Sequence, residues 1–144
     1  MKLVIDTNIV FSTLLNPHSL IGEILMNVQD QYTFFAPELL KEEIKRYQSK
    51  ISTYSKLNHS DLLVLEELLF SNINLVPHEL ISERSWLNAY KLTKDIDEDD
   101  TPFIALAIEL NARLWTGDKI LLKGLLKKRS SIIITTTDLR KQLG

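Results

Sequence analysis

At 144 residues and without a single cysteine, the chain has the length of one domain, and disulfides, thiolate metal sites and cysteine nucleophiles are excluded. Hydrophobic residues make up 44% and charged residues 25%, which is ordinary for a globular protein in water. The formal net charge is −2, so any binding of nucleic acid must use a local basic surface or metal ions.

Neither a secretory signal nor a membrane span is predicted. Three apolar residues separate Lys2 from Asp6, and no uninterrupted apolar run approaches the length of a bilayer crossing. We therefore expect a cytoplasmic protein that does not enter a membrane. Internal repeats, low-complexity tracts and linkers are absent from the sequence, which predicts one domain over residues 1–144.

Strand and helix signals alternate along the chain, and this pattern predicts an α/β fold with a largely parallel sheet. Strands are predicted at residues 2–5, 32–36, 73–76, 113–116 and 131–135. Helices are predicted at residues 7–15, 19–28, 37–47, 60–70, 82–93, 102–112 and 119–128, and from Thr137 onward. In three of them we expect Pro37 in the first turn, Ser60-Asp61 as the cap, and Trp86, Ala89, Tyr90 and Leu92 facing inward. The polar residues 50–58 are expected to form a loop or a frayed helix end.

An aspartate follows two of the predicted strands, Asp6 after the first and Asp118 after the fourth. Each aspartate is equally suited to cap the helix that follows, and Gly117 permits a tight turn before Asp118. Binding sites in α/β folds form outside the carboxyl ends of parallel strands, so the two carboxylates are expected to point toward one place. Carboxylates that approach one another need a positive charge between them, and a hard divalent cation is the simplest candidate.

Two further acidic positions are candidates for the same place. Residues 97–100 form an acidic run directly before a helix that reads as buried, so Asp100 is expected near the sheet edge, with Asp99 as a close rival. On the helix predicted at residues 37–47, Glu43 lies on the flank of the apolar stripe, whereas Glu42 lies further from it. For both groups, a solvent-exposed acidic surface is the alternative interpretation.

Four segments in this order resemble the PIN-domain family of metal-dependent nucleases, including toxin ribonucleases of the VapC type. They are VIDTN at residues 4–8, LKEEI at 40–44, DDTPFIALA at 99–107 and LWTGDKILL at 114–122. The resemblance covers nearly the whole chain and is closest to the short toxin branch with a Thr-Gly-Asp-Lys turn. Each motif alone is weak, and their combination is what carries the resemblance.

The resemblance implies a three-layer α/β/α sandwich around a sheet of about five strands. It implies that Asp6, Glu43, Asp100 and Asp118 bind Mg²⁺ or Mn²⁺ and are the catalytic residues, while Asn8 and Thr116 support them by hydrogen bonding. The implied reaction is hydrolysis of phosphodiester bonds in RNA, with one or two metal ions. For a toxin, a small antitoxin protein is the expected partner, and exposed apolar residues on the early helices would favour a homodimer.

A basic face beside the Thr-Gly-Asp turn is the candidate for substrate binding. Lys119, Lys123 and Lys127 recur every four residues and share one side of the predicted helix, although a solvated helix face has the same pattern. Phosphate contacts from this face would make binding strongly salt-dependent. DNA as the substrate and a PIN fold that binds without cutting remain open. Receiver-type and dehalogenase-type phosphotransfer are disfavoured, because one aspartate follows the first strand and residue 8 is Asn.

Overall fold

Five parallel strands form the centre of the molecule, in the order β3-β2-β1-β4-β5. The computed structural model describes residues 1–143. The strands are β1 (Lys2–Ile5), β2 (Thr33–Pro37), β3 (Ile73–Val76), β4 (Arg113–Trp115) and β5 (Ile133–Ile134). Leu3, Val4 and Ile5 of the central strand are all buried, as expected for a parallel strand that is covered on both faces. The predicted parallel sheet is confirmed.

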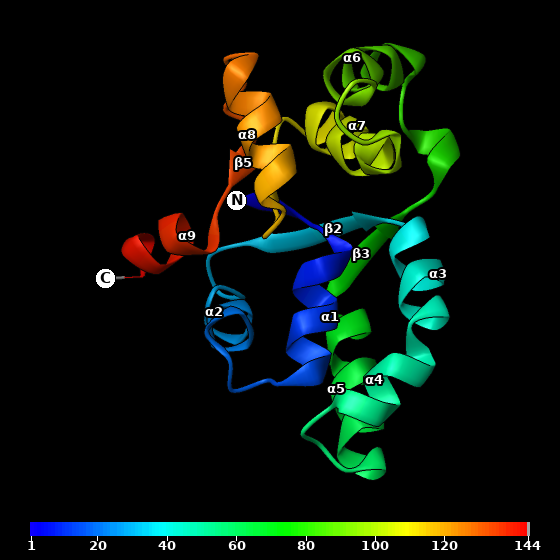
Figure 1. Cartoon of the computed structure of the whole chain (residues 1–144), viewed down its shortest axis with the longest axis vertical. Helices are drawn as coiled ribbons and strands as arrows, with labels where there is room; N and C mark the ends of the chain where they lie inside the picture. The colour runs from blue at the N-terminus through cyan, green and yellow to red at the C-terminus, as the bar shows by residue number, and fades with distance from the viewer. Residues whose placement is uncertain (144) are drawn as a thin grey trace.

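Helices cover both faces of this sheet, and Figure 1 shows α6 and α7 on one side and α1 to α5 on the other. The helices are α1 (Thr7–Leu15), α2 (Leu20–Asn27), α3 (Leu39–Arg46), α4 (Gln48–Tyr54), α5 (His59–Ser71), α6 (Glu83–Thr93), α7 (Thr101–Leu110), α8 (Lys119–Lys127) and α9 (Thr136–Gln142). Two short 3₁₀ turns, η1 (His78–Leu80) and η2 (Glu98–Asp100), precede α6 and α7. The three-layer α/β/α architecture is therefore confirmed.

Helix α7 is the most deeply buried helix and packs against β1, β2 and β4. Five consecutive residues, Phe103 to Ala107, are at most 2% exposed, which explains the nearly continuous apolar sequence there. The helix ends at Asn111, whose left-handed backbone (φ 51°) turns the chain back toward β4. Its first residue, Thr101, follows the acidic run directly, so this packing fixes the position of Asp100.

Four details of the predicted elements are wrong. Pro37 is the last residue of β2, where it pairs with Val76, and does not begin a helix. Residues within the predicted loop 50–58 continue helix α4, which buries Ile51 completely. The cap of α5 is Asn58 rather than Ser60 or Asp61. Tyr90 is 45% exposed, because it lies on the outer side of α6.

The helices of residues 1–143 differ little in their suitability for a membrane, because all of them are short. No single helix there is long and apolar enough to cross a bilayer, whereas α1 and α2, bent by 110° at their junction, pass that test of length and composition as a pair.

Candidate functional site

The turns after β1 and β4 lie side by side at the carboxyl edge of the sheet. The two strands are paired neighbours, with Ile5 opposite Trp115, and the backbone N–H of Asp6 donates to the carbonyl of Trp115 at 3.0 Å. The sheet register therefore brings Asp6 next to the Thr116-Gly117-Asp118 turn. This edge is where binding sites form in parallel α/β folds.

The buried hydroxyl of Thr116 connects the two turns. It donates a hydrogen bond of 2.6 Å to Oδ2 of Asp6 and accepts one of 3.1 Å from the backbone N–H of Asp118. The side chain of Asn8 adds a weaker link, since its Nδ2 donates to Thr116 at 3.4 Å and its Oδ1 accepts from the N–H of Gly117 at 3.4 Å. These bonds fix the orientation of the Asp6 carboxylate relative to the second turn.

Asp6 and Asp118 are both helix caps as well as members of this edge. Asp6 accepts from the N–H of Thr7 at 2.8 Å, and Asp118 accepts from the N–H groups of Ile120 and Leu121 at 3.0 and 3.1 Å. Both bonds to Asp118 end on Oδ1, so its Oδ2 is not used for capping. An ionised carboxylate has about four acceptor sites. Each aspartate can therefore cap a helix and still accept a further contact.

Gly117 is not required by the geometry of the turn. Its φ lies outside the left-handed region, and a Cβ atom built on it would meet no atom within 4 Å. The conformational freedom that the sequence suggested for this glycine is therefore not used. The turn is held instead by the hydrogen bonds to Thr116 and Asn8.

The carboxylate of Asp100 differs from the other two because it caps nothing. The residue precedes α7 but makes no side-chain capping bond. Its Oδ2 is buried and has no hydrogen-bond partner, which is a rare and costly state for a polar atom. Asp99 beside it is exposed to solvent. Of the two neighbouring candidates, the structure thus brings Asp100 and not Asp99 into the enclosed part of the site.

Glu43 approaches the same carboxylates from α3. Its side chain is half-buried, whereas that of Glu42 is exposed, in agreement with their places relative to the apolar stripe. The buried hydroxyl of Thr7, which has no hydrogen-bond partner of normal geometry, lies in the same region. Four acidic side chains from four separate segments therefore share one edge of the sheet.

Burial, together with repulsion among these acids, raises the pKa values of three of them. Burial raises the pKa of Asp100 to about 7, with further contributions from the charges of Asp6, Asp97 and Asp118. Burial raises the pKa of Asp6, against the opposing hydrogen bonds from Thr116 and Thr7. Burial and the charge of Asp6 likewise raise the pKa of Glu43. Clustering of raised carboxyl pKa values in one place is typical of functional sites.

Asp97 is an acidic neighbour of the site for which no role was predicted. Its carboxylate caps the 3₁₀ turn by accepting from the N–H of Asp99 at 2.9 Å, and its charge reaches Asp100. The sequence feature that could have predicted this turn is the position of Asp97, because an aspartate often accepts a hydrogen bond from the backbone N–H two residues further on. We regard Asp97 as the residue that shapes the acidic turn.

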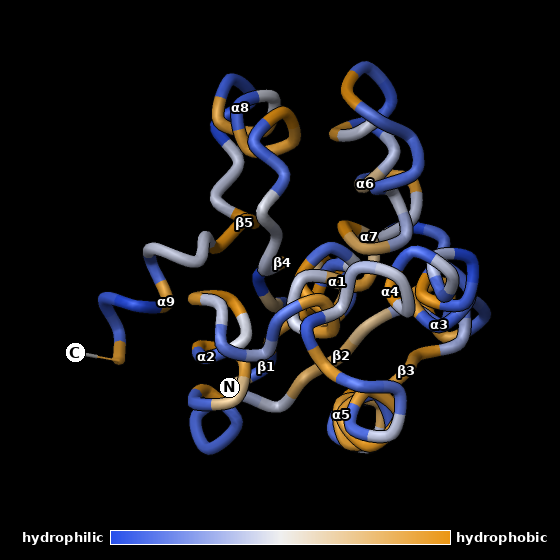
Figure 2. Tube along the Cα trace, turned by 60° about the horizontal axis from the view of Figure 1, so that its bottom comes forward, coloured by the Kyte–Doolittle hydropathy of each residue, from blue (hydrophilic) through white to orange (hydrophobic). Residues whose placement is uncertain are grey.

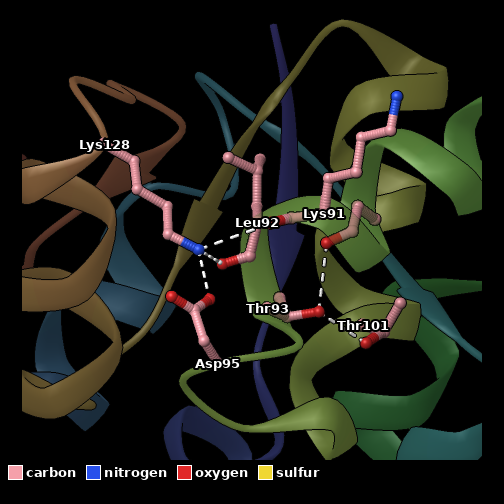
Figure 3. Close-up of polar contacts among 7 residues, drawn as sticks. Lys91, Leu92, Thr93, Asp95, Thr101 and Lys128 are labelled. Carbon is pink, nitrogen blue, oxygen red and sulfur yellow. Dashed lines mark hydrogen bonds and ion pairs between the residues drawn. The ribbon is translucent and has the colours of Figure 1, made fainter.

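The connection between α6 and α7, which contains Asp97 and Asp100, is anchored at both of its ends (Figure 3). On one side, the ammonium of Lys128 donates to the carbonyls of Lys91 and Leu92 and forms an ion pair with Asp95. On the other side, the hydroxyls of Thr93 and Thr101 share a buried hydrogen bond of 2.6 Å. The chain between α6 and α7 is thus tied to the end of α8 and to the start of α7.

The three lysines of the predicted basic face, Lys119, Lys123 and Lys127, are all exposed on α8. The helix begins directly after Asp118, so its first lysine lies beside the acidic edge and the third about 12 Å further along the axis. His18, His59 and His78 are exposed, which leaves an all-oxygen set of acidic side chains at the edge.

The arrangement was tested for its ability to hold a metal ion. Over residues 1–143, no three acidic or histidine side chains already converge closely enough to enclose one. The chemistry of the site nevertheless fits a hard divalent cation. Its side-chain donors are oxygens, the carboxylates repel one another, and the buried Oδ2 of Asp100 has no partner.

Comparisons with known proteins agree with this architecture. The model of the PIN domain family matches residues 4–141. An uncharacterized protein of Methanocaldococcus jannaschii, MJ1680, is 32% identical over 125 residues, which are 85% of this chain and 74% of that protein.

Two solved structures share the fold. VapBC2 from Rickettsia felis, bound to a DNA fragment from its promoter, aligns with a TM-score of 0.64 at 18% identity over 94% of this chain and 97% of that chain. VapBC-1 from nontypeable Haemophilus influenzae aligns with a TM-score of 0.63 at 22% identity over 95% of this chain and 99% of that chain. With the family match over almost its whole length, the chain belongs to the PIN-domain family, a family of nucleases.

Proposed function

We propose that this protein is a metal-dependent endoribonuclease, with Asp6, Glu43, Asp100 and Asp118 as its metal-binding and catalytic residues. The observation that carries the proposal is the buried, unpartnered Oδ2 of Asp100, on a carboxyl group whose pKa is raised to about 7 by burial and by neighbouring acids. Mg²⁺ or Mn²⁺ would satisfy this oxygen and offset the repulsion at once.

In this proposal, the acidic side chains would bind the metal ion, and the polar and basic side chains around them would orient these ligands and hold the RNA. Asp6, Asp100 and Asp118 offer carboxylate oxygens from three segments, and Glu43 adds a fourth from α3. Thr116 and Asn8 hold the orientation of Asp6 through the bonds between the two turns. A divalent ion bound by these oxygens supplies a water of lowered pKa and stabilises the charge that develops at phosphorus. The exposed lysines of α8 would hold the phosphates of the strand.

We further propose that the protein is the toxin of a toxin–antitoxin pair. Support comes from the sequence resemblance to the short toxin branch and from the two structural relatives, both of which are VapBC proteins. A small antitoxin protein is the expected partner. A basic side chain of that partner would be attracted to the acidic edge and would compete with the metal ion.

The decisive experiment is cleavage of labelled RNA and of single-stranded DNA with Mg²⁺ or Mn²⁺, with EDTA, and with the variant Asp118→Asn. Asparagine caps a helix as well as aspartate does, so this variant should keep its fold and lose the ionic ligand. We expect a loss of activity of about 100-fold or more, comparable to the removal of a group that stabilises developing charge.

The matched control is Asp138→Asn, because Asp138 belongs to the capping box of α9 and takes no part in the acidic edge. It should cleave like the wild type. Activity that survives both EDTA and Asp118→Asn would contradict the mechanism. Cleavage of DNA alone would change the substrate, and metal-dependent binding without any cleavage would favour a PIN fold that no longer cuts.

A further inference from the structure

A cavity of about 360 Å³ lies close to the acidic edge, between α3, η1, α6 and the start of α7. Its apolar walls are Pro37, Leu39, Ile81, Trp86 and Pro102. Glu42 also lines it and directly precedes Glu43, while Pro102 follows Asp100 by two residues. Neighbouring Cα atoms are about 3.8 Å apart, so the cavity begins within one nucleotide's reach of the acids.

We propose that this cavity, which we call the aromatic slot, binds one nucleobase of the RNA substrate and prefers guanine to uracil. The inference rests on the proposed function, since it names the part of the substrate that enters beside the catalytic acids. The size of the slot is at the lower end of small-ligand pockets, which suits a single nucleoside.

An aromatic pair forms one side of the slot. The rings of His78 and Trp86 lie with their centroids 4.4 Å apart at an interplanar angle of 33°. Trp86 is half-buried and His78 is exposed, so the pair is fixed at its base and open at its rim. Single-stranded nucleic acids bind to such platforms by stacking their bases on aromatic rings. None of the bonds that fix the acidic edge involves these two residues, so the acidic site leaves them without a role.

The charge of the rim decides which part of a nucleotide can enter. Glu38 and Glu42 are exposed at the slot, and their carboxylates would repel a phosphate group. They accept hydrogen bonds and donate none, so they suit the N–H groups of a base. Guanine presents two adjacent donors, N1–H and the N2 amino group, whereas uracil presents one. The base would therefore enter the slot while its phosphate stays at the metal-binding edge.

The test uses RNA pentamers with a central guanine, uracil or abasic site and uridine elsewhere. They are titrated against the Asp118→Asn protein in Mg²⁺, so that a cation can offset the remaining carboxylates while cleavage is suppressed. Tryptophan fluorescence reports on the slot, because Trp115, the other tryptophan, is fully buried. We expect the guanine pentamer to change this fluorescence and to bind about tenfold more tightly than the abasic one. Uracil should lie between the two.

Variants separate stacking from hydrogen bonding. For these variants, binding is followed by the fluorescence anisotropy of dye-labelled pentamers, which needs no tryptophan as reporter. Trp86→Leu should remove the difference in affinity between the guanine and abasic pentamers, and Trp86→Phe should restore most of it. The double variant Glu38→Leu, Glu42→Leu removes both acceptors. It should keep stacking and reduce the preference for guanine over uracil. The control is Leu87→Ala, a neighbouring exposed side chain that does not line the slot. It should behave like the wild type.

Equal affinity for all three pentamers would overturn the slot, as would a guanine preference that Trp86→Leu leaves intact. Quenching of Trp86 by a cognate antitoxin but not by RNA would overturn it too, by assigning the slot to a protein. The two proposals fail separately. Base-dependent binding without cleavage would support the slot and contradict the nuclease, whereas cleavage without base dependence would do the reverse.

Discussion

Of the acidic residues at the edge, Asp100 contributes least to the stability of the fold. Asp6 and Asp118 each cap a helix, so removing their charge also disturbs local structure. Asp100 makes no capping bond, and its buried oxygen has no partner. Without a bound metal, the side chain of Asp100 therefore lowers the free energy of unfolding, since its buried oxygen makes no compensating hydrogen bond. Sites that are destabilising in the apo state and useful when occupied are a common form of the trade-off between stability and activity.

We predict that Asp100→Asn stabilises the metal-free protein, and more at pH 8 than at pH 5. The pKa of this carboxyl group is raised from 3.8 to about 7 by burial and by its acidic neighbours. Between these values the folded state binds more protons than the unfolded state, so the free energy of unfolding falls as the pH rises through that window. Asparagine has no proton to lose, so the variant removes the part of this dependence that comes from Asp100, while the raised pKa values of Asp6 and Glu43 leave the rest.

The measurement is the midpoint of thermal unfolding at pH 5 and pH 8, in EDTA and in Mn²⁺. In EDTA, the unfolding midpoint of the wild type should be lower at pH 8 than at pH 5. Mn²⁺ should raise this midpoint most at pH 8. Asp30→Asn is the matched control, since Asp30 is exposed and its charge does not contribute to the raised pKa of Asp100. If Asp100→Asn lowered the midpoint at pH 8, or kept the full response to Mn²⁺, the role given to Asp100 would be wrong.

The sequence alone could not separate Asp99 from Asp100. Both residues precede the same buried helix. Helical periodicity does not extend into the turn before this helix, so it cannot predict which of the two side chains points toward the site. The choice depends on a tertiary detail, the 3₁₀ turn that Asp97 caps. For Asp6 and Asp118, in contrast, the strand pattern was enough to predict that the two residues lie at the same edge of the sheet, because parallel strands end at one edge.

At the level of elements, helix α8 joins the acidic edge to the basic face. We predict that Lys123→Gln together with Lys127→Gln weakens RNA binding and reduces the slope of log K against log salt concentration by about 1.4, or roughly 0.7 for each phosphate contact. The measurement is RNA affinity at several salt concentrations in EDTA. The control pair is Lys2→Gln with Lys141→Gln, exposed lysines of β1 and α9. An unchanged slope in the α8 pair would show that this helix does not hold phosphate.

The elements that sequence reasoning placed correctly are rich in apolar residues, either in a nearly continuous run, as in α7, or in a stripe along one side, as in α8. The failures have a common physical cause, which is that tertiary packing decides the structure of weak local patterns. Helix α4 has a polar sequence and is held by one completely buried side chain, Ile51. Pro37 ends β2 after the pairing with β1 has stopped, so the missing N–H costs no bond on that side.

At the scale of the whole molecule, helix α5 is apolar on both its inner and its outer side. Leu62 and Leu69 are buried, while Leu63, Val64 and Leu68 are 51%, 66% and 42% exposed. Figure 2 shows this helix nearly end-on, with hydrophobic residues around much of its circumference. A helix with apolar residues on every side is normally covered on every side. Exposed apolar residues were expected on the early helices, where α2 exposes Leu20 and Met26. The larger group lies instead on α5, in the middle of the chain.

We predict that the outer side of α5 forms a homodimer interface. The double variant Val64→Glu, Leu68→Glu places two charges one turn apart on this side and should separate the protomers without touching the core. Light scattering coupled to size exclusion should then give the 16.6 kDa of one chain, compared with twice that mass for the wild type. Leu126→Glu, on the exposed side of α8, is the control and should stay dimeric. A wild-type protein that is monomeric at every concentration would refute the interface.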